Sequence, residues 1–310
     1  MSLLRTKSID VLIADSEEPG KRLNKSLGPW SLTALGIGAV IGSGIFILTG
    51  TAAAGETLAV PSVLNAPILD LILHGGSASS TIGRPGAGPG ISLSFLLVAI
   101  VCLFAGLCFA ELASMIPIAG SAYTYAYATL GEIFAWIIGW DLILEYAVSN
   151  MAVAVGFSAY FNDILEALFG FHLPKHLSEP MIVGGEFTGS VFNVPALLII
   201  LALTWILVRG VKESATANNA MVVIKVLAIL AFIFAAGGHV NPANYHPFMP
   251  NGFPGVVTGA AIVFFTYIGF DSVSTAAEEC RQPQRDLPIG ILMTLFICTL
   301  LYISVSLVLT

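Results

Sequence analysis

The sequence carries very little charge for its length. Of its 310 residues only 10% are Asp, Glu, Lys or Arg, whereas 56% are hydrophobic, and the mean hydropathy is +0.90. A soluble domain of this size needs far more charged surface to enclose its core. The composition therefore excludes a soluble globular protein and indicates an integral membrane protein.

Cysteine is also scarce, and the chain has four of them. Cys102, Cys108 and Cys298 lie in apolar segments and Cys280 in a polar one, and their spacing matches no metal site. Neither a disulfide framework nor a metal centre is expected. Charged residues precede the first long apolar run, so residues 1–29 are expected to form a cytoplasmic tail rather than a cleavable signal peptide.

Long apolar runs fill most of the remaining sequence. A membrane-spanning helix needs about 20 apolar residues to cross about 30 Å of hydrocarbon. Seven segments meet this length, at about 30–54, 91–116, 133–161, 193–209, 219–237, 255–277 and 287–309. The sequence thus predicts an all-α integral membrane fold.

Lys and Arg are distributed unevenly between the loops. With a cytoplasmic N-terminus, only Arg84 and Lys175 lie on the outer side. The inner segments then hold nine: Arg5, Lys7, Lys21, Arg22, Lys25, Arg209, Lys212, Arg281 and Arg285. By the positive-inside rule this bias predicts a multi-pass protein of the cell (inner or plasma) membrane with its N-terminus in the cytoplasm.

The first span is interrupted in its middle by Gly-Ser-Gly at residues 42–44. Glycine in such a span often serves close helix packing, but three adjacent residues point in different directions and cannot all face one neighbour. Local unwinding explains them better. It would free N–H groups near Ile45, suited to a carboxylate, and carbonyls near Ile41, suited to an ammonium group.

The sixth span has a similar interruption around Gly269, and a break is predicted near Thr266 to Gly269. Interrupted spans at corresponding positions of two halves are typical of transporters with inverted repeats, which bind substrate at the bilayer midplane. Equivalence of spans one and six predicts a five-plus-five inverted-repeat transporter fold, here truncated to about seven transmembrane helices with broken spans one and six.

Lys225 lies inside the fifth span. Inserting such a lysine costs roughly 2.5 to 3.5 kcal/mol, which a functional role would justify. One interpretation is a lysine that extends to the cytoplasmic interface. The other is a buried amine that gains and loses a proton during transport and binds the carbonyls freed by the first break.

The third span contains Asp141 and Glu145, which are four residues apart and share one helix face. A carboxylate inside the membrane is a functional candidate by default. Glu145 is the deepest, and we expect it to line the pathway, with structural hydrogen bonding as the alternative.

Four stretches resemble the amino acid, polyamine and organocation permeases, most closely the bacterial relatives of the cationic amino acid transporters. They are LGIGAVIGSGIF at 35–46, AELASMIPIAGSAYTY at 110–125, WDLILEY at 140–146, and YIGFD at 267–271 running into AAEE at 276–279. The resemblance implies a five-plus-five fold with an amino acid bound between the two breaks.

Carried over by position, the resemblance also implies roles for individual residues. The substrate's ammonium and carboxylate groups would meet Ile41, Ser43 and Gly44. The backbone of Phe265, Thr266 and Ile268 would complete the ammonium site, and Glu145 would face the pathway. Lys225 matches the lysine that replaces a sodium ion in proton-coupled members.

The expected organisation has four parts. These are a tail at 1–29, a first five-helix repeat at 30–238 with an external insertion at 60–87, an external linker at 239–254, and the start of a second repeat at 255–310. The family needs spans eight and ten to close its sites, whereas this sequence ends after span seven.

Two functions follow from these patterns. The first is secondary active transport of amino acids, coupled to protons by alternating access. The alternative is a truncated, non-transporting membrane protein that senses amino acids or serves as a partner subunit, with further spans supplied elsewhere. Because no nucleotide-binding spacing, zincin motif or nucleophile elbow is present, no enzyme activity, cofactor, metal ion or nucleic-acid partner is expected.

Overall fold

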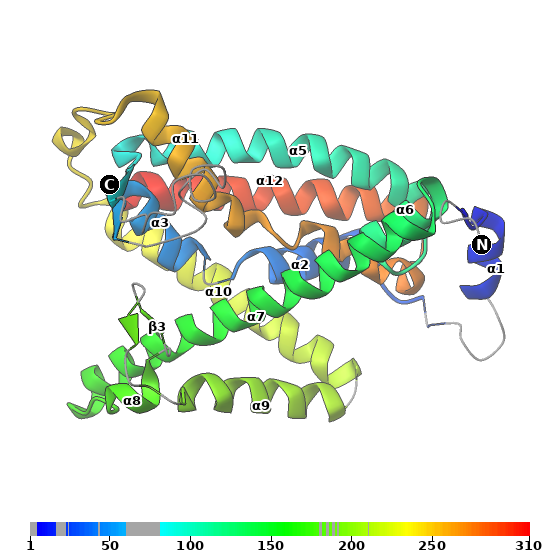
Figure 1. Ribbon diagram of the computed structural model, residues 1–310, viewed down its shortest axis with the longest axis horizontal. Helices are drawn as coiled ribbons and strands as arrows, with labels where there is room; N and C mark the ends of the chain where they lie inside the picture. Colours follow the sequence, from blue (N-terminus) through cyan, green and yellow to red (C-terminus); the bar gives the residue numbers. More distant parts are fainter. Residues whose placement is uncertain are drawn as a thin grey trace, which may run out of the picture.

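A computed structural model describes residues 5–16, 23, 25–42, 44–59, 81–179, 182–183, 186–187, 190, 192–209 and 211–310. The helices are α1 (Ile9–Ser16), α2 (Pro29–Val40), α3 (Gly44–Ala54), α5 (Ile91–Met115), α6 (Ser121–Thr129), α7 (Glu132–Phe169), α8 (Lys175–Ser178), α9 (Val194–Arg209), α10 (Val211–Gly237), α11 (Gly252–Val263) and α12 (Pro283–Leu309) (Figure 1). Short 3-10 helices are η1 (Gly88–Gly90), η2 (Pro242–Tyr245), η3 (Phe264–Tyr267) and η4 (Phe270–Glu279).

The structure confirms the predicted helical membrane fold. Five segments are long and apolar enough to cross a membrane: Gly88–Met115, Glu132–Phe169, Asn218–Gly237, Gly252–Glu279 and Pro283–Leu309. The bent pair α2 and α3 makes a sixth. Helix α9, at the predicted fourth span, has 16 residues, about 24 Å at 1.5 Å per residue. Among the described residues, length alone thus supports six of the seven predicted spans.

Two antiparallel hairpins outside the spans add to the predicted helices. Strand β1 (Gly55–Ala59) pairs with β2 (Thr81–Pro85), and β3 (Ile182–Val183) pairs with β4 (Glu186–Phe187). The β1–β2 hairpin brackets most of the segment expected to be an insertion. Residues 60–80 of that segment lie outside the described part, but Ala87 at its end is fully packed, with 1% of its surface exposed.

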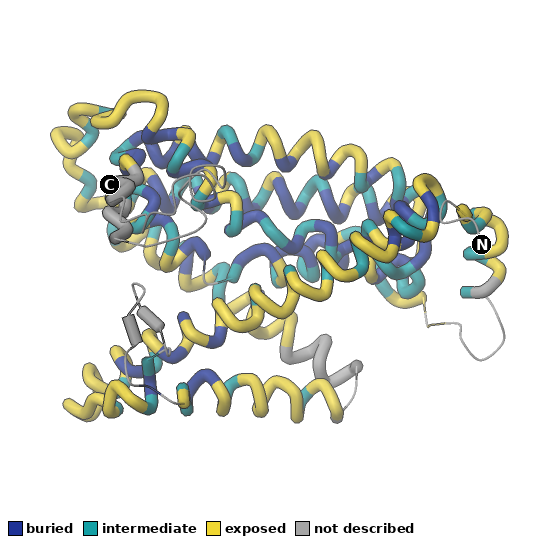
Figure 2. Tube along the Cα trace, viewed as in Figure 1, coloured by how far each residue is buried: buried dark blue, intermediate teal, exposed yellow. Residues whose placement is uncertain are grey.

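The core is arranged around α12, which packs along both α5 and α2 (Figure 1). A Cβ at Gly36 would overlap the side chains of Thr294 and Val273, so this close approach of α2 to α12 requires glycine. Figure 2 shows buried residues following α2 and α12, whereas much of α7 and α9 is exposed. Large apolar side chains on that exposed surface, such as Trp136 and Val208, suit contact with lipid.

Both predicted breaks are present. The axes of α2 and α3 meet at 49°. Helix α2 ends because the Gly42 N–H bonds the Val40 carbonyl at 3.0 Å instead of continuing the helical pattern to Gly38. In the sixth span, α11 passes through η3 into Gly269, whose φ of +111° stops the helix before η4.

Gly269 supports a stability prediction. A Cβ there would lie 3.1 Å from backbone atoms of Ala39, at a φ that other residues adopt only with strain. We expect Gly269→Ala to lower the unfolding free energy by about 1–3 kcal/mol, measured as a lower Tm of the detergent-purified protein. Gly50→Ala is the control, since a Cβ there meets nothing within 4 Å. Equal melting of both variants would contradict the prediction.

Candidate functional site

The two breaks lie directly against each other. A Cβ on Gly44, the first residue of α3, would come within 2.8 Å of the Thr266 Cγ2 atom in the second break. On the other side, Gly269 approaches the backbone of Ala39 at the end of α2. Glycine at both positions lets the two unwound backbones touch, so atoms from both breaks are available to one site.

Lys225 reaches the first break from α10. Its Nζ donates hydrogen bonds to the carbonyls of Gly38 and Ile41, each at 2.6 Å. The Gly38 carbonyl needs a partner because the Gly42 N–H has turned to Val40, and the last carbonyls of any helix lack intrahelical donors. The half-buried ammonium therefore satisfies the broken helix end and does not extend to the interface.

Tyr302 of α12 connects the two breaks. Its hydroxyl lies 3.0 Å from the Val40 carbonyl and 2.9 Å from the Thr266 carbonyl. A hydroxyl has a single proton to donate, so the two carbonyls share it. The Tyr302 ring is completely buried and packs on Phe95 and Tyr267, which holds the hydroxyl in place between the breaks.

An acidic cavity of about 320 Å³ opens beside the second break, between α5, α6 and α7. Its lining includes Ile268 and the carboxyl-bearing residues Asp141, Glu145 and Asp271, and no Lys or Arg among the described residues. Ser121 donates a hydrogen bond to Asp271 at 3.0 Å. Three carboxyl groups without a cation make this cavity suited to a positively charged group.

The structure separates the predicted site residues into two groups. Ile41, Gly44 and Thr266 are buried where the breaks meet. Glu145 and Ile268 instead line the acidic cavity. Of the other three predicted residues, Lys225 reaches the first break from α10. Phe265 is half-buried and does not line this cavity, and Ser43 lies outside the described residues.

Sequence reasoning did not assign a role to Tyr302, nor did it pair Asp271 with Ser121. Tyr302 lies in a continuous apolar span with no glycine or charge beside it, so its only signal is a hydroxyl that must find a partner once buried. Ser121 and Asp271 are 150 positions apart, and their contact depends on how α6 packs against η4.

Tyr302 supports a second stability prediction. Tyr302→Phe removes the donor shared by Val40 and Thr266 and leaves buried carbonyl oxygens short of a hydrogen bond. We expect a loss of about 1–3 kcal/mol, seen as a lower Tm in detergent. Tyr123→Phe is the matched control, because Tyr123 is 41% exposed. The same Tm for Tyr302→Phe and the wild type would show that the hydroxyl does not hold the breaks together.

Comparison with known proteins agrees with this geometry. A family model described as "Amino acid permease" matches residues 27–310. The branched-chain amino acid permease BcaP of Bacillus subtilis (strain 168) is 48% identical over 310 residues, which cover 100% of this chain and 59% of that protein. The methylthioribose transporter of the same organism is 46% identical over 309 residues, with the same coverage of 100% and 59%.

A plant relative is more distant. Cationic amino acid transporter 9, chloroplastic, of Arabidopsis thaliana is 37% identical over 318 residues, covering 100% of this chain and 50% of that protein. The chain thus spans 59% of the length of the two bacterial relatives.

The resemblance found in the sequence motifs is therefore confirmed over nearly the whole chain. The contact between the breaks of the first and sixth spans and the matching family model both support the same family assignment. The chain belongs to the amino acid permease family and is a multi-pass membrane protein.

Proposed function

We propose that this protein is a secondary active transporter of amino acids, coupled to protons by alternating access. The observation that carries the proposal is the hydrogen bonding of Lys225 to two carbonyls of the first break. A titratable amine bound to the unwound backbone links proton binding to the geometry of the proposed substrate site.

The substrate proposal rests on the polarity of the broken helices. The first N–H groups of a helix such as α3, which starts at Gly44, lack intrahelical acceptors and favour a carboxylate, and carbonyls at the ends of α2 and η3 favour an ammonium group. A free amino acid carries both groups. We assign the substrate's polar ends to Ile41, Ser43 and Gly44 and to the backbone of Phe265, Thr266 and Ile268, with Glu145 lining the route.

The proposed substrate class is free amino acids, and no single side chain is assigned. Two of the three relatives described above are named for branched-chain or cationic amino acids, and the third for methylthioribose. The acidic cavity with Asp141, Glu145 and Asp271 favours passage of a positively charged group. The negative charge of these carboxyl groups suits the ammonium group that every amino acid carries.

The coupling proposal follows from the strength of the Lys225 hydrogen bonds. A protonated amine makes charge-assisted bonds, which are roughly twice as strong as neutral ones. Loss of the proton would weaken both contacts to Gly38 and Ile41 and loosen the end of α2. Substrate and proton would then share one element that changes between two arrangements.

The proposed location is the cell (inner or plasma) membrane with a cytoplasmic N-terminus. It is supported by the uneven distribution of Lys and Arg described above. The α1 helix lies at the end of the bundle opposite to α8 and the β3–β4 hairpin (Figure 1), so these elements would face opposite sides of the membrane.

Uptake by proteoliposomes tests the proposal. We expect an imposed inward pH gradient to drive uptake of labelled amino acids, and Lys225→Ala to reduce this uptake at least tenfold, because the break loses its titrating partner. Lys225→Arg keeps a charge that does not titrate and should bind substrate but lose the response to pH. The control is Arg285→Ala, an exposed cation outside the breaks.

The outcomes separate the two functions. Uptake that ignores the pH gradient would contradict proton coupling, and normal pH-driven uptake by Lys225→Ala would remove the role of the lysine. Substrate binding by the purified protein without any uptake would favour the alternative, an amino acid sensor or a partner subunit.

A further inference from the structure

Three aromatic rings lie between the acidic cavity and the end of the bundle where α1 is found. Phe109 and Phe270 line the cavity, and their ring centroids are 5.8 Å apart in an edge-to-face arrangement. Tyr125 of α6 packs on Phe109 at 5.9 Å. These three residues, called the aromatic cluster below, belong to a larger core with residues from α2, α5, α6, η4 and α12. The α1 helix lies beyond α6 at the same end (Figure 1), so the cluster closes the cavity on the α1 side.

The α1 helix packs on this core with one face. Ile9, Leu12 and Ile13 have the i, i+3, i+4 spacing that places side chains on one side of a helix, and all three contact the core. Val11 lies on the opposite face, with 48% of its surface exposed. The apolar face of α1 therefore covers the core that contains the aromatic cluster.

Backbone hydrogen bonds fasten the residues just before α1 to the turn between α6 and α7. The Lys7 N–H bonds the Tyr127 carbonyl at 3.4 Å, and the Glu132 N–H bonds the Arg5 carbonyl at 3.1 Å. Tyr127 lies near the end of α6, and Glu132 is the first residue of α7. Residues 5–7 thus connect the two helices at the end that α1 covers.

A second segment, residues 25–28, fastens the two broken spans to each other. The N–H groups of Ser26 and Leu27 bond the Glu279 carbonyl at 2.9 and 3.0 Å, and the Arg281 N–H bonds the Leu27 carbonyl at 3.0 Å. Helix α2 begins at Pro29, and η4 ends at Glu279. The α1-side ends of the first and sixth spans are therefore held together by their backbones.

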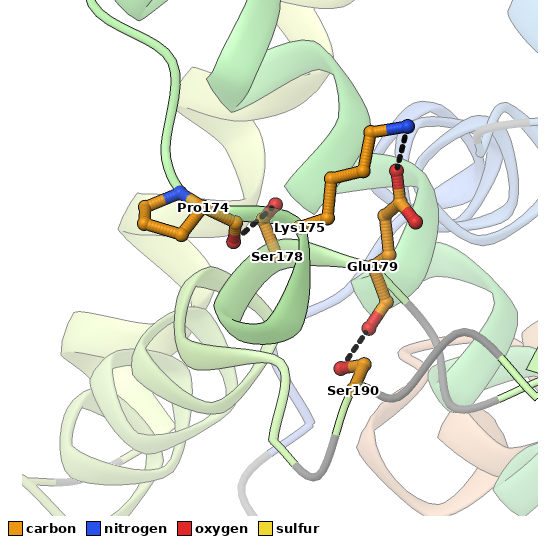
Figure 3. Close-up of polar contacts among 5 residues, drawn as sticks. All are labelled: Pro174, Lys175, Ser178, Glu179 and Ser190. Carbon is orange, nitrogen blue, oxygen red and sulfur yellow. Dashed lines mark hydrogen bonds and ion pairs between the residues drawn. The ribbon is translucent and has the colours of Figure 1, made fainter.

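The hydrogen bonds at the other end of α7 have a different reach. Figure 3 shows Ser178 bonding the Pro174 carbonyl and Ser190 bonding the Glu179 carbonyl, and these partners are 4 and 11 positions apart. Such bonds order α8 and the loop beside it. The bonds of residues 5–7 and 25–28 instead join elements that are distant in the sequence, so they restrain how the spans lie relative to one another.

We propose that residues 5–16 and 25–28 form a latch, which keeps the aromatic cluster closed and must release before the cavity opens on the α1 side. The inference rests on the proposed transport, because alternating access requires each end of the site to open in turn. The latch bonds α6, α7 and η4, and each of these elements contributes residues to the cavity lining. Separation of these elements at the α1 end therefore breaks the latch, whose strength sets how often this end opens.

Labelling of a thiol in the cavity tests the latch. Ala122→Cys places a thiol in the cavity lining, and Cys108→Ser removes the exposed native thiol from the same protein. A membrane-impermeant maleimide is added to sealed vesicles on the α1 side. We expect Leu12→Ser to raise the labelling rate about tenfold, because weaker packing of α1 shifts the population toward the open form. Val11→Ser, on the exposed face of the same helix, should leave the rate unchanged.

A reversible cross-link tests the latch in the opposite direction. Leu27 pairs with Cys280 in a β-bridge, and backbones paired in this way are about 4.8 Å apart, within the range that a disulfide spans. We expect oxidation of the Leu27→Cys protein to slow cavity labelling and amino acid uptake about tenfold, and a reductant to restore both. Leu27→Ser, oxidised in the same way, is the control. This arm remains informative if Leu12→Ser fails to fold, as judged by melting.

The outcomes separate the latch from the transport proposal. Unchanged cavity labelling in both Leu12→Ser and oxidised Leu27→Cys would overturn the latch. If transport itself is absent, no variant takes up amino acids, yet faster labelling of Leu12→Ser than of Val11→Ser would still support the latch.

Discussion

The structure depends on how the unwound backbone of the first break is satisfied. Peptide carbonyls inside a membrane have no water to bond, and each unsatisfied one is costly. Here the end of α2 receives the Lys225 ammonium on Gly38 and Ile41, and the Tyr302 hydroxyl on Val40. These donors come from α10 and α12, so the break is stable only when both helices pack against α2. An interruption that looks local in the sequence is thus a tertiary feature.

Glycines near the breaks serve two different purposes, which resolves the choice between packing and unwinding. Gly36 lets α2 approach α12, and a Cβ at Gly38 would lie 3.0 Å from Val222 of α10, so these two glycines act in packing. Gly44 and Gly269 instead bring the two breaks together. Close helix packing and local unwinding therefore both occur in the glycine-rich first span, and different glycines serve each of them.

Much of the fold and part of the site could be predicted from the sequence. Hydropathy predicts the spans and glycine placement indicates where the breaks lie, because both signals are present in the local sequence, although the donors that stabilise the first break come from other helices. The approach of Lys225 to carbonyls of the first break follows from the cost of burying an amine without acceptors. The hydroxyl of Tyr302 and the hydrogen bond from Ser121 to Asp271 could not be found in this way, since each depends on the packing of helices distant in sequence. The assigned substrate and proton roles stay predictions.

The length of α7 has a mechanical consequence. Glu145 lies near the acidic cavity beside the second break, whereas Phe169 at the end of the helix is 24 positions away, about 36 Å along the axis. If α7 turns as a rigid rod about Glu145, a tilt of about 10° displaces that end by about 6 Å. A small rearrangement at the membrane centre would then become a large movement at the surface.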